Sequence, residues 1–324
     1  MACFRKIVEM CKKMKVIRSF LYCLRRILGF TKLQDEITKL QEEVSTLYYF
    51  MDLQIDPQKL PKTNDEDLRI LQDCDTLLLG ILDKMCKRHG LTYWIEYGTL
   101  LGAVRHGGFI PWDDDTDVAM PRADFEKAYD LMHDELARYG ITLEYGINEL
   151  AWLQLHYRHR ETGIWIDISP MDTFVSPYDL DGTRNFLSPL ISKYIEFFDS
   201  HVMNTSTDKL WEMKQRLIFS NQTGQYRYLF HGQEFRQSKI RIFKENDLIP
   251  CSRLSFNGIE LNSPANPCSY LLYVYGDKFM NIPHRGIEHH GLALNRPPLS
   301  KWAKIHGVNM QDVYKHLQKV YEDL

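Results

Sequence analysis

The fold of this chain is decided by the stretch Tyr93–Asp124, which reads YWIEYGTLLGAVRHGGFIPWDDDTDVAMPRAD. Its first residues, 93–97, are rich in aromatic and branched side chains and predict a β-strand. The glycines at 98 and at 107–108 predict breaks, because the backbone there needs conformations that side chains disfavour. The stretch then brings four aspartates into five positions: Asp113, Asp114, Asp115 and Asp117.

This acidic cluster predicts a metal site. Neighbouring carboxylates repel one another and favour a solvated loop unless a cation neutralises them, yet the flanking residues 110–112 and 118–120 are apolar. In a strand, Asp115 and Asp117 point to the same face and present paired carboxylates. Hard oxygen ligands of this kind suit Mg²⁺ or Mn²⁺, which also bind substrate phosphates.

Groups that can bind phosphate lie just before the cluster. The turn at Gly98 and Thr99 can bring backbone N–H groups and a hydroxyl close to a phosphate. Arg105 and His106 add donors for phosphate oxygens. A phosphate-binding turn, a basic pair and paired carboxylates within so short a stretch indicate phosphoryl transfer.

Two other interpretations of the cluster remain. A calcium loop of the EF-hand type requires glycine at its sixth position and glutamate at its twelfth, and these positions hold Val118 and Asp124. A solvated acidic turn without chemistry is the second interpretation, and the apolar flanks weigh against it.

The same stretch resembles the signature of the LicD family, part of the nucleotidyltransferase-fold superfamily that includes DNA polymerase β. The resemblance lies in GTLLG at 98–102, RH at 105–106, FIPWDDD at 109–115 and Asp117. Weaker resemblance extends from about Leu68 to about His290, and the first 60 residues carry none. The family implies an α+β fold, a mixed sheet flanked by helices with a helical subdomain on the acceptor side, to which this chain adds an N-terminal helical extension.

By this resemblance the chain would be a metal-dependent phosphotransferase. It would move phosphocholine, or a related phospho-alcohol, from CDP-choline or another CDP-alcohol to a cell-surface glycan or lipid-linked glycan precursor. Asp115 and Asp117 would hold Mg²⁺ or Mn²⁺, and Asp113 would support them. One alternative is a nucleotidyltransferase that releases pyrophosphate, and another is a non-catalytic scaffold recruited to a membrane.

The strand predicted at 164–168 supplies a further acid, Asp167, among isoleucines. Burying such an acid without a counter-charge is costly. The superfamily has a third catalytic carboxylate on an adjacent strand, and Asp167 is the candidate for that role, as a metal ligand and as the group that takes the acceptor's proton. A structural salt bridge, with Asp172 close by, is the alternative. Arg158 could bind a phosphate or neutralise Asp167.

A late segment also resembles the LicD pattern: the Tyr-Gly-Asp at 275–277, a following proline and a late histidine. His289 or His290 is therefore a candidate substrate contact, ranked below the aspartates because adjacent histidines in a loop are often incidental.

The N-terminal residues differ from the rest of the chain. Residues 1–32 combine nine basic side chains with a single acid and with apolar residues at helical spacing. This predicts an amphipathic helix on an anionic membrane surface, or one that packs on protein. Residues 33–51 carry a short heptad pattern that favours a parallel homodimer or packing within the chain. We expect a linker up to residue 60, a nucleotidyltransferase core at 61–175 and a helical, LicD-like region at 176–324.

Composition narrows the class of protein. The 324 residues are 44% hydrophobic, enough for a sizeable core, and the net charge of −3 argues against a nucleic-acid binder. Seven scattered cysteines without a C-x-x-C pair predict reduced thiols. No apolar run of membrane-spanning length and no signal peptide are evident. We expect a cytoplasmic protein, with peripheral attachment to the inner face of a membrane as an option.

Other elements follow from local patterns. Residues 63–90 predict a helix with acidic residues at its start and a glycine at its end. A helix is predicted to begin near 121–124, a hairpin strand at 256–261, and one helix at 302–324.

Overall fold

The computed structural model describes residues 30–54, 56–145, 153–158, 160–201, 205–231, 241–282 and 299–324. The chain divides into two compact units, Met1–Asp56 and Pro57–Leu324. The described part of the first unit is a single helix, α2 (Phe30–Gln54). The predicted basic segment 1–32 lies almost entirely outside the described residues.

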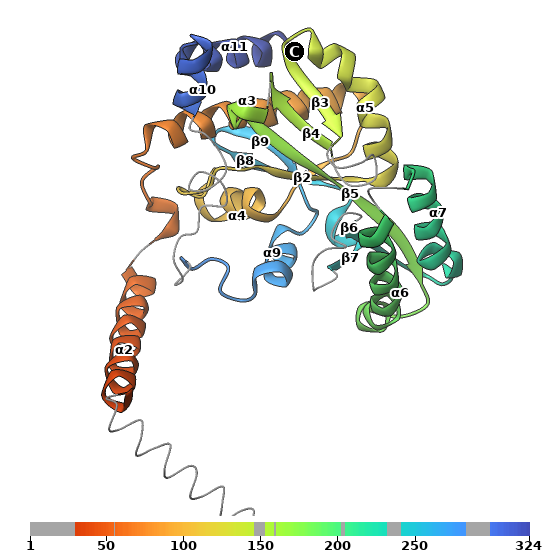
Figure 1. Ribbon diagram of the computed structural model, residues 1–324, viewed down its shortest axis with the longest axis horizontal. Coiled ribbons are helices and arrows are strands. Elements are labelled where there is room, and N and C mark those ends of the chain that lie inside the picture. The colour runs from red at the N-terminus through yellow and green to blue at the C-terminus, as the bar shows by residue number, and fades with distance from the viewer. Residues whose placement is uncertain are drawn as a thin grey trace, which may run out of the picture. The chain divides into compact units, whose positions relative to one another are not determined.

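A seven-stranded mixed sheet forms the centre of the second unit (Figure 1). Five strands lie in the order β1-β2-β5-β4-β3, and β6 and β7 extend the sheet from the second half of β5. Only β2 and β5 pair in parallel among the described strands. The strands are β1 (Trp94–Ile95), β2 (Asp117–Pro121), β3 (Ile141–Tyr145), β4 (Leu153–Tyr157), β5 (Trp165–Ser176), β6 (Tyr226–His231) and β7 (Ile242–Lys244).

Helices flank this sheet, which confirms the mixed α+β class. Figure 1 shows α10 and α11 beside α3, and α6 and α7 beside the end of the sheet that carries β6 and β7. The helices are α3 (Glu66–His89), α4 (Tyr97–His106), α5 (Arg122–Ala137), α6 (Leu180–His201), α7 (Thr207–Leu217), α8 (Glu245–Leu248), α9 (Pro267–Tyr275), α10 (Leu299–His306) and α11 (Met310–Asp323). A separate hairpin joins β8 (Ser252–Phe256) to β9 (Ile259–Ser263).

Helix α3 begins and ends where its sequence predicts. The side chain of Asp65 accepts a hydrogen bond from the N–H of Leu68 at 3.1 Å and caps the first turn. Gly90 ends the helix in the left-handed region, with φ of 65°, where a side chain would be strained. The capping signals of this helix are therefore confirmed.

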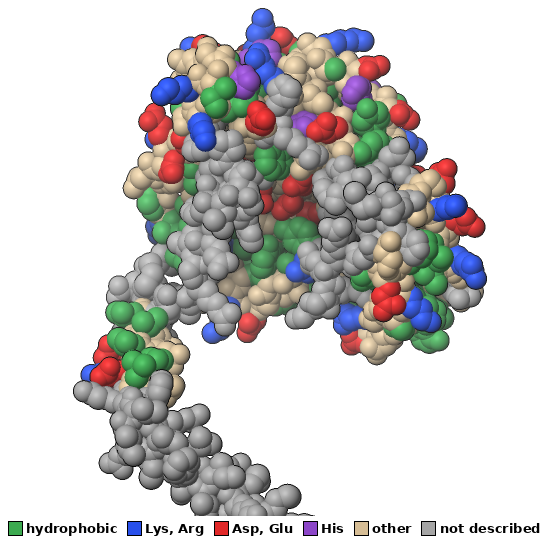
Figure 2. Space-filling view, viewed as in Figure 1, with side chains coloured by type: hydrophobic (Ala, Val, Ile, Leu, Met, Phe, Trp, Pro, Cys, Tyr) green, Lys and Arg blue, Asp and Glu red, His purple; other side chains and the backbone are tan. Residues whose placement is uncertain are grey.

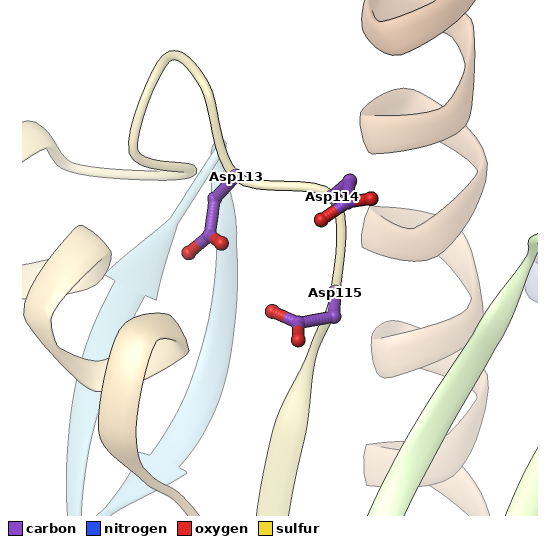
Figure 3. A group of neighbouring side chains, drawn as sticks. All are labelled: Asp113, Asp114 and Asp115. Carbon is purple, nitrogen blue, oxygen red and sulfur yellow. The ribbon is translucent and has the colours of Figure 1, made fainter. Parts of the chain in front are cut away.

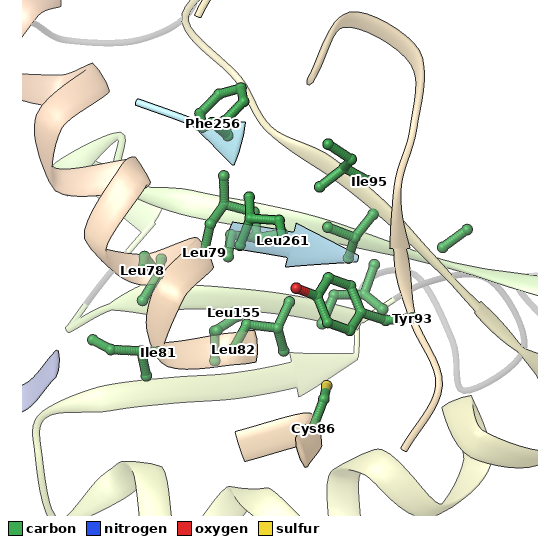
Figure 4. Close-up of a cluster of buried hydrophobic side chains, with 14 of the residues drawn as sticks. Leu78, Leu79, Ile81, Leu82, Cys86, Tyr93, Ile95, Leu155, Phe256 and Leu261 are labelled. Carbon is green, nitrogen blue, oxygen red and sulfur yellow. The ribbon is translucent and has the colours of Figure 1, made fainter. Parts of the chain in front are cut away.

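The hydrophobic core lies between α3, the central sheet and the β8–β9 hairpin (Figure 4). Leu78, Leu79 and Leu82 of α3 are fully buried, as are Leu155 of β4 and Leu261 of β9. Burying each such side chain stabilises the fold by about 1.5–3 kcal/mol, so these contacts hold α3 against the sheet.

The strand predicted at 93–97 is shorter than expected. Only Trp94 and Ile95 are strand residues, and α4 already begins at Tyr97. The leucines and alanine that follow favour a helix, and the hydroxyl of Thr99 accepts a hydrogen bond from the N–H of Asp117 at 2.9 Å. This bond ties the first turn of α4 to the start of β2, so residues 98–99 lie in a helix rather than in a loop.

The single helix predicted at 302–324 is also wrong, because two helices occupy this region. Gly307, with φ of 64°, ends α10, and the side chain of Asn309 accepts a hydrogen bond from the N–H of Gln311 to begin α11. Trp302, Val313 and Leu317 are buried as expected.

The region at 176–324 contains more than helices. It begins with α6 and α7, but β6 and β7 then join the central sheet and β8 and β9 form their hairpin. Tyr226–His231 is rich in aromatic residues, which fit a half-buried pleated surface better than a helix. This region therefore completes the sheet in addition to flanking it.

Candidate metal and phosphate site

Three consecutive aspartates gather in the loop that leads into β2. Asp113, Asp114 and Asp115 each offer a carboxylate oxygen, and these oxygens lie within 4.8 Å of one another. Figure 3 shows the carboxylates of Asp113 and Asp115 turned toward each other. Asp114, to which the sequence assigned no role, is 1% exposed. Such spacing suits the coordination of one divalent cation by several oxygens.

A second set of acids lies across the neighbouring strands. In the β2–β5 register Asp117 is paired directly with Asp167, and in the β4–β5 register Asp167 is paired with Gln154. On the other side of β2, the N–H of Glu96 donates to the carbonyl oxygen of Asp117 at 3.0 Å. Residues directly opposite each other share a face of the sheet. We call Glu96, Asp117, Asp167 and Gln154 the cross-strand row.

The charges of this site act on one another strongly. Burial, followed by the charges of Asp115, Glu96 and Asp167, raises the pKa of Asp117 well above its usual value. Burial and the neighbouring carboxylates of Asp115 and Asp114 raise the pKa of Asp113 to about 8. Without a cation the cluster therefore retains protons near neutral pH.

The first turn of α4 lies against the aspartates. A Cβ atom placed on Gly98 would lie 2.8 Å from Oδ2 of Asp113, so a larger residue here would displace the Asp113 carboxylate. Thr99 is buried, with its hydroxyl bound to the N–H of Asp117. The start of a helix presents backbone N–H groups and favours anions. Gly98 and Thr99 lie in this first turn, and their phosphate contact stays a prediction.

Arg105 and His106 lie at the other end of α4 and hold other parts of the chain. The guanidinium of Arg105 donates to the carbonyl oxygens of Phe279 and Asn281 at 3.0 and 2.9 Å. Nε2 of His106 accepts from Nε of Arg105, and Nδ1 of His106 lies 2.8 Å from the carbonyl oxygen of Pro57. Burial and the charge of Arg105 lower the pKa of His106 to about 4, so its ring is neutral at pH 7. Their phosphate contact stays a prediction.

Arg158 does not lie opposite Asp167. It follows the last residue of β4, and its guanidinium lies over the ring of Tyr157, with 5.3 Å between the guanidinium carbon and the ring centroid. The side chain that donates to Asp167 is Gln154, whose Nε2 is 2.6 Å from Oδ1. His289 and His290, the late histidine candidates, lie outside the described residues.

Asp172, the acid that lies close to Asp167 in the sequence, forms a buried salt bridge. Arg122 donates from Nε to Oδ1 of Asp172 at 2.7 Å, and Lys214 is paired with Oδ2. We call these three residues the ion triad. All three are at least nine-tenths buried, and they join β5 to α5 and α7.

Three further residues belong to the surroundings of the site and were not assigned to it from the sequence. Glu96 is fully buried, and as an acid in an apolar strand it carries the same signal that singled out Asp167. The guanidinium of Arg241 lies over the ring of Tyr97 at 5.0 Å. Tyr275 is 44% exposed as a whole residue, while burial of its hydroxyl and the charges of Asp117 and Asp113 raise the pKa of that hydroxyl. Nothing in the local sequence predicts these two approaches.

The site lies at the surface of the second unit. Figure 2 shows a hollow with acidic side chains at its bottom, over the position of β2 and β5 in Figure 1. The donor set consists of carboxylate oxygens, and the charges of Asp115 and Asp114 add to burial in raising the pKa of Asp113. Both observations fit Mg²⁺ or Mn²⁺, which prefer oxygen ligands and relieve such repulsion.

Comparison with known proteins identifies the class. Residues 90–214 match the sequence model of the family described as LicD/FKTN/FKRP, nucleotidyltransferase domain. The match covers less than half of the chain and confirms the resemblance found in the motif residues. Both sets of acids, at 113–117 and at 167, lie inside the matched segment.

Individual relatives are similar over shorter segments. The chain is 43% identical over 68 residues to the lipopolysaccharide cholinephosphotransferase LicD of Haemophilus influenzae, which covers 20% of this chain and 26% of the relative. It is 43% identical over 53 residues to the human ribitol 5-phosphate transferase FKRP, covering 16% and 10%. It is 22% identical over 134 residues to the mannosyltransferase regulator 4 of Saccharomyces cerevisiae, covering 37% and 11%. The chain thus spans about a quarter of the first relative and about a tenth of the other two.

In the described part of the chain, no helix is both long and apolar enough to cross a membrane.

Proposed function

We propose that this protein is a metal-dependent phosphotransferase with a nucleotidyltransferase-type sheet. It would move a phospho-alcohol from a CDP-activated donor to a hydroxyl of a glycan or of a lipid-linked glycan precursor. One observation carries the proposal: the register of β2 and β5 sets Asp117 beside Asp167, next to the cluster that contains Asp115. Two relatives of the matched domain are phosphotransferases by name, which supports the same reaction class.

In this proposal Asp115, Asp117 and Asp167 hold Mg²⁺ or Mn²⁺, and Asp113 supports Asp115 through the contact between their carboxylates. The metal, when bound, neutralises the charge of the donor diphosphate. The N–H groups at the start of α4, at Gly98 and Thr99, bind phosphate oxygens.

The remaining step belongs to the acceptor. Its oxygen would attack the phosphorus of the phospho-alcohol while the bond from that phosphorus to CMP breaks and CMP leaves. Asp167 is the proposed acceptor of the proton that the hydroxyl loses. The amide of Gln154 fixes the Asp167 carboxylate in the row, so that it keeps one orientation during the reaction.

The test is calorimetric binding of a CDP-alcohol with Mg²⁺ present and then with EDTA. CDP-choline and CDP-ribitol are the two probes, because the relatives named above transfer choline phosphate and ribitol phosphate. We expect binding that requires both the metal and Asp117, and the loss of this binding in Asp117→Asn. The matched control is Asp134→Asn, which removes an acid whose side chain is 95% exposed on α5. Binding that is indifferent to both metal and Asp117 contradicts the proposal.

A second candidate function is a nucleotidyltransferase that releases pyrophosphate, which the description of the matched domain favours. The acids of the site serve both reactions. The products separate them, because phospho-alcohol transfer yields CMP whereas nucleotidyl transfer from an NTP yields pyrophosphate.

We further propose that α2 pairs with a second copy of this chain. Its heptad side chains Leu33, Leu40 and Leu47 are 53%, 58% and 63% exposed within the described residues. Exposed leucines at this spacing are stabilised when they pack in a coiled coil. Leu40→Glu is expected to shift sedimentation from dimer to monomer, whereas Gln41→Glu, next to it in the helix, is expected to leave the dimer intact. Binding of residues 1–32 to anionic lipid stays a prediction that vesicle co-sedimentation tests.

A further inference from the structure

Glu96 occupies a position in the sheet that faces the proposed metal ligands. The β1–β2 register pairs Ile95 with Val118, and the next pair along is Glu96 with Asp117, joined by the backbone hydrogen bond from Glu96. Directly opposite residues of an antiparallel pair have Cβ atoms about 5 Å apart on one face. The charge of Glu96 also contributes to the raised pKa of Asp117. Glu96 and Asp117 therefore face the same space.

One oxygen of the Glu96 carboxylate is held by the protein. Oε2 lies 3.1 Å from Nε2 of His231, at the end of β6, and accepts a hydrogen bond from the hydroxyl of Tyr270 at 3.3 Å. The side chains of His231 and Glu96 are 1% and 0% exposed. The ring of His231 is itself stacked on Tyr97, with centroids 5.3 Å apart. His231 of β6 and Tyr270 of α9 thus hold this oxygen, and Tyr97 at the start of α4 supports the His231 ring.

The other oxygen has no such partner. Oε1 of Glu96 is fully buried and makes no hydrogen bond within the described residues. A buried acceptor without a partner costs about 1–3 kcal/mol, and more when it is charged. Buried polar groups of this kind call for an explanation, and an ion is among the usual ones.

Stability does not explain the pair of Glu96 and His231. A buried carboxylate and imidazole are often replaced by apolar side chains without loss of stability. The residue between Glu96 and the phosphate-facing turn, Tyr97, has φ of 44°, a left-handed value that costs energy in a residue with a side chain. Such strained positions cluster at sites of ligand binding and catalysis.

We propose that Glu96 is a further ligand of the metal, through Oε1, and that His231 and Tyr270 position its carboxylate. The inference rests on the proposed function, because it adds to that metal site. It follows a common arrangement in which groups behind a metal ligand orient it, and removing them typically weakens metal affinity 10- to 100-fold. The ligand is a divalent cation with a preference for oxygen, as elsewhere in the site.

The test is Mn²⁺ binding by paramagnetic resonance, measured on the full chain without any substrate. Glu96→Gln keeps the size of the side chain and is expected to weaken Mn²⁺ affinity at least about 10-fold, as loss of an oxygen ligand should. His231→Gln is expected to weaken it as well, although His231 would touch no metal. Eu³⁺ luminescence lifetimes in H₂O and D₂O, which count metal-bound water, are expected to show one more water when Glu96 is replaced by Ala.

The matched control is Asp83→Asn, which removes another buried acid of the same unit. Asp83 is 5% exposed and paired with Arg253, on the opposite side of β1 from the metal site as its contact with Tyr93 shows. Wild-type affinity in this control supports the inference, and an equal loss overturns it. Mn²⁺ binding by Glu96→Gln and His231→Gln that equals wild type also overturns it, while loss in Asp117→Asn leaves the proposed function standing. Absence of Mn²⁺ binding by the wild type overturns both.

Discussion

Asp167 and Asp172 lie five residues apart on β5, and their surroundings are opposite. Asp167 sits in the cross-strand row among other acids, whereas Asp172 is enclosed by the two cations of the ion triad. Burial alone would raise the pKa of Asp172, but the charges of Arg122 and Lys214 lower it. The chain neutralises one buried acid with its own side chains and gathers others that repel. The first arrangement joins β5 to α5 and α7, and the second is the proposed metal site.

The largest expected effect comes from opening the ion triad. Asp172→Asn leaves Arg122 and Lys214 buried without their anion and is expected to lower the free energy of unfolding by about 3–5 kcal/mol. Denaturation by urea measures this change. Asp134→Asn, on the surface of α5, is the control and should stay within about 0.5 kcal/mol of wild type. A triad variant as stable as its control would show that Asp172 is not structural.

The same substitution in the cross-strand row is expected to act in the other direction. Asp117→Asn removes one of several repelling charges, so the metal-free protein should be at least as stable as wild type. The variant is expected to be less stable than wild type only when metal is present. Mg²⁺ at 100 times its dissociation constant stabilises wild type by about 2.7 kcal/mol, and it should stabilise the variant by much less. Thermal unfolding with and without Mg²⁺ measures both. Destabilisation without metal would break the contrast between the two acids.

The pH dependence of stability should separate the two sets of charges. The raised pKa of Asp113, about 8, means that its contribution is full below the unfolded pKa near 4 and is lost as the pH rises to about 8. The lowered pKa of Asp172 gives the opposite sign, since its contribution is present above about 4 and lost in acid. One group changes the free energy of unfolding by at most about 1.4 kcal/mol per pH unit.

This pH dependence is measured by urea denaturation from pH 4 to 9, with EDTA and with Mg²⁺. We expect Mg²⁺ to stabilise the protein more at pH 8 than at pH 6, because protons compete for the same oxygens. Asp113→Asn should reduce the fall in the free energy of unfolding between about pH 4 and 8, and should leave its fall in acid unchanged. If neither Mg²⁺ nor Asp113→Asn changes the free energy of unfolding as the pH rises toward 8, the cluster does not titrate in that range.

The smallest effect is expected at Gln154, the uncharged member of the cross-strand row. Gln154→Leu removes the amide that donates to Asp167 and should change the free energy of unfolding by about 1 kcal/mol. Because the amide orients a proposed metal ligand, Mn²⁺ affinity should fall about 10-fold. The control is Gln311→Leu at the exposed start of α11, which should leave the affinity unchanged. Equal affinities in both variants would show that Asp167 needs no orienting group.

Sequence reasoning located the acids but could not arrange all of them. Asp113, Asp115 and Asp117 are neighbours in the chain, so their proximity follows from local geometry. Asp167 was singled out because an acid in an apolar strand is costly. Arg158 was a candidate either to bind a phosphate or to neutralise Asp167. The antiparallel register places Gln154, not Arg158, opposite Asp167, and one strand alone does not reveal its register.

Some helix boundaries follow from the local sequence, and others depend on tertiary contacts. The ends of α3 follow from Asp65 and Gly90, whose effects on the backbone are local. The start of α4 does not follow from the local sequence, because residues 93–97 carry strand-forming side chains. The helix nevertheless begins at Tyr97, in the turn where Thr99 is tied to β2. A contact between residues distant in the chain outweighed the local preference.

The sequence by itself determined the class of this protein, since its domain family and its acidic cluster rest on residues that are neighbours in the chain. Only the tertiary structure decided which charges meet. It paired Asp172 with Lys214 and Arg122, set Asp117 between Asp167 and Glu96, and brought His231 to Glu96 from a strand far along the chain. The physical reason is that strand register and helix packing, which depend on the whole core, bring these charges together, and their energies depend on that proximity.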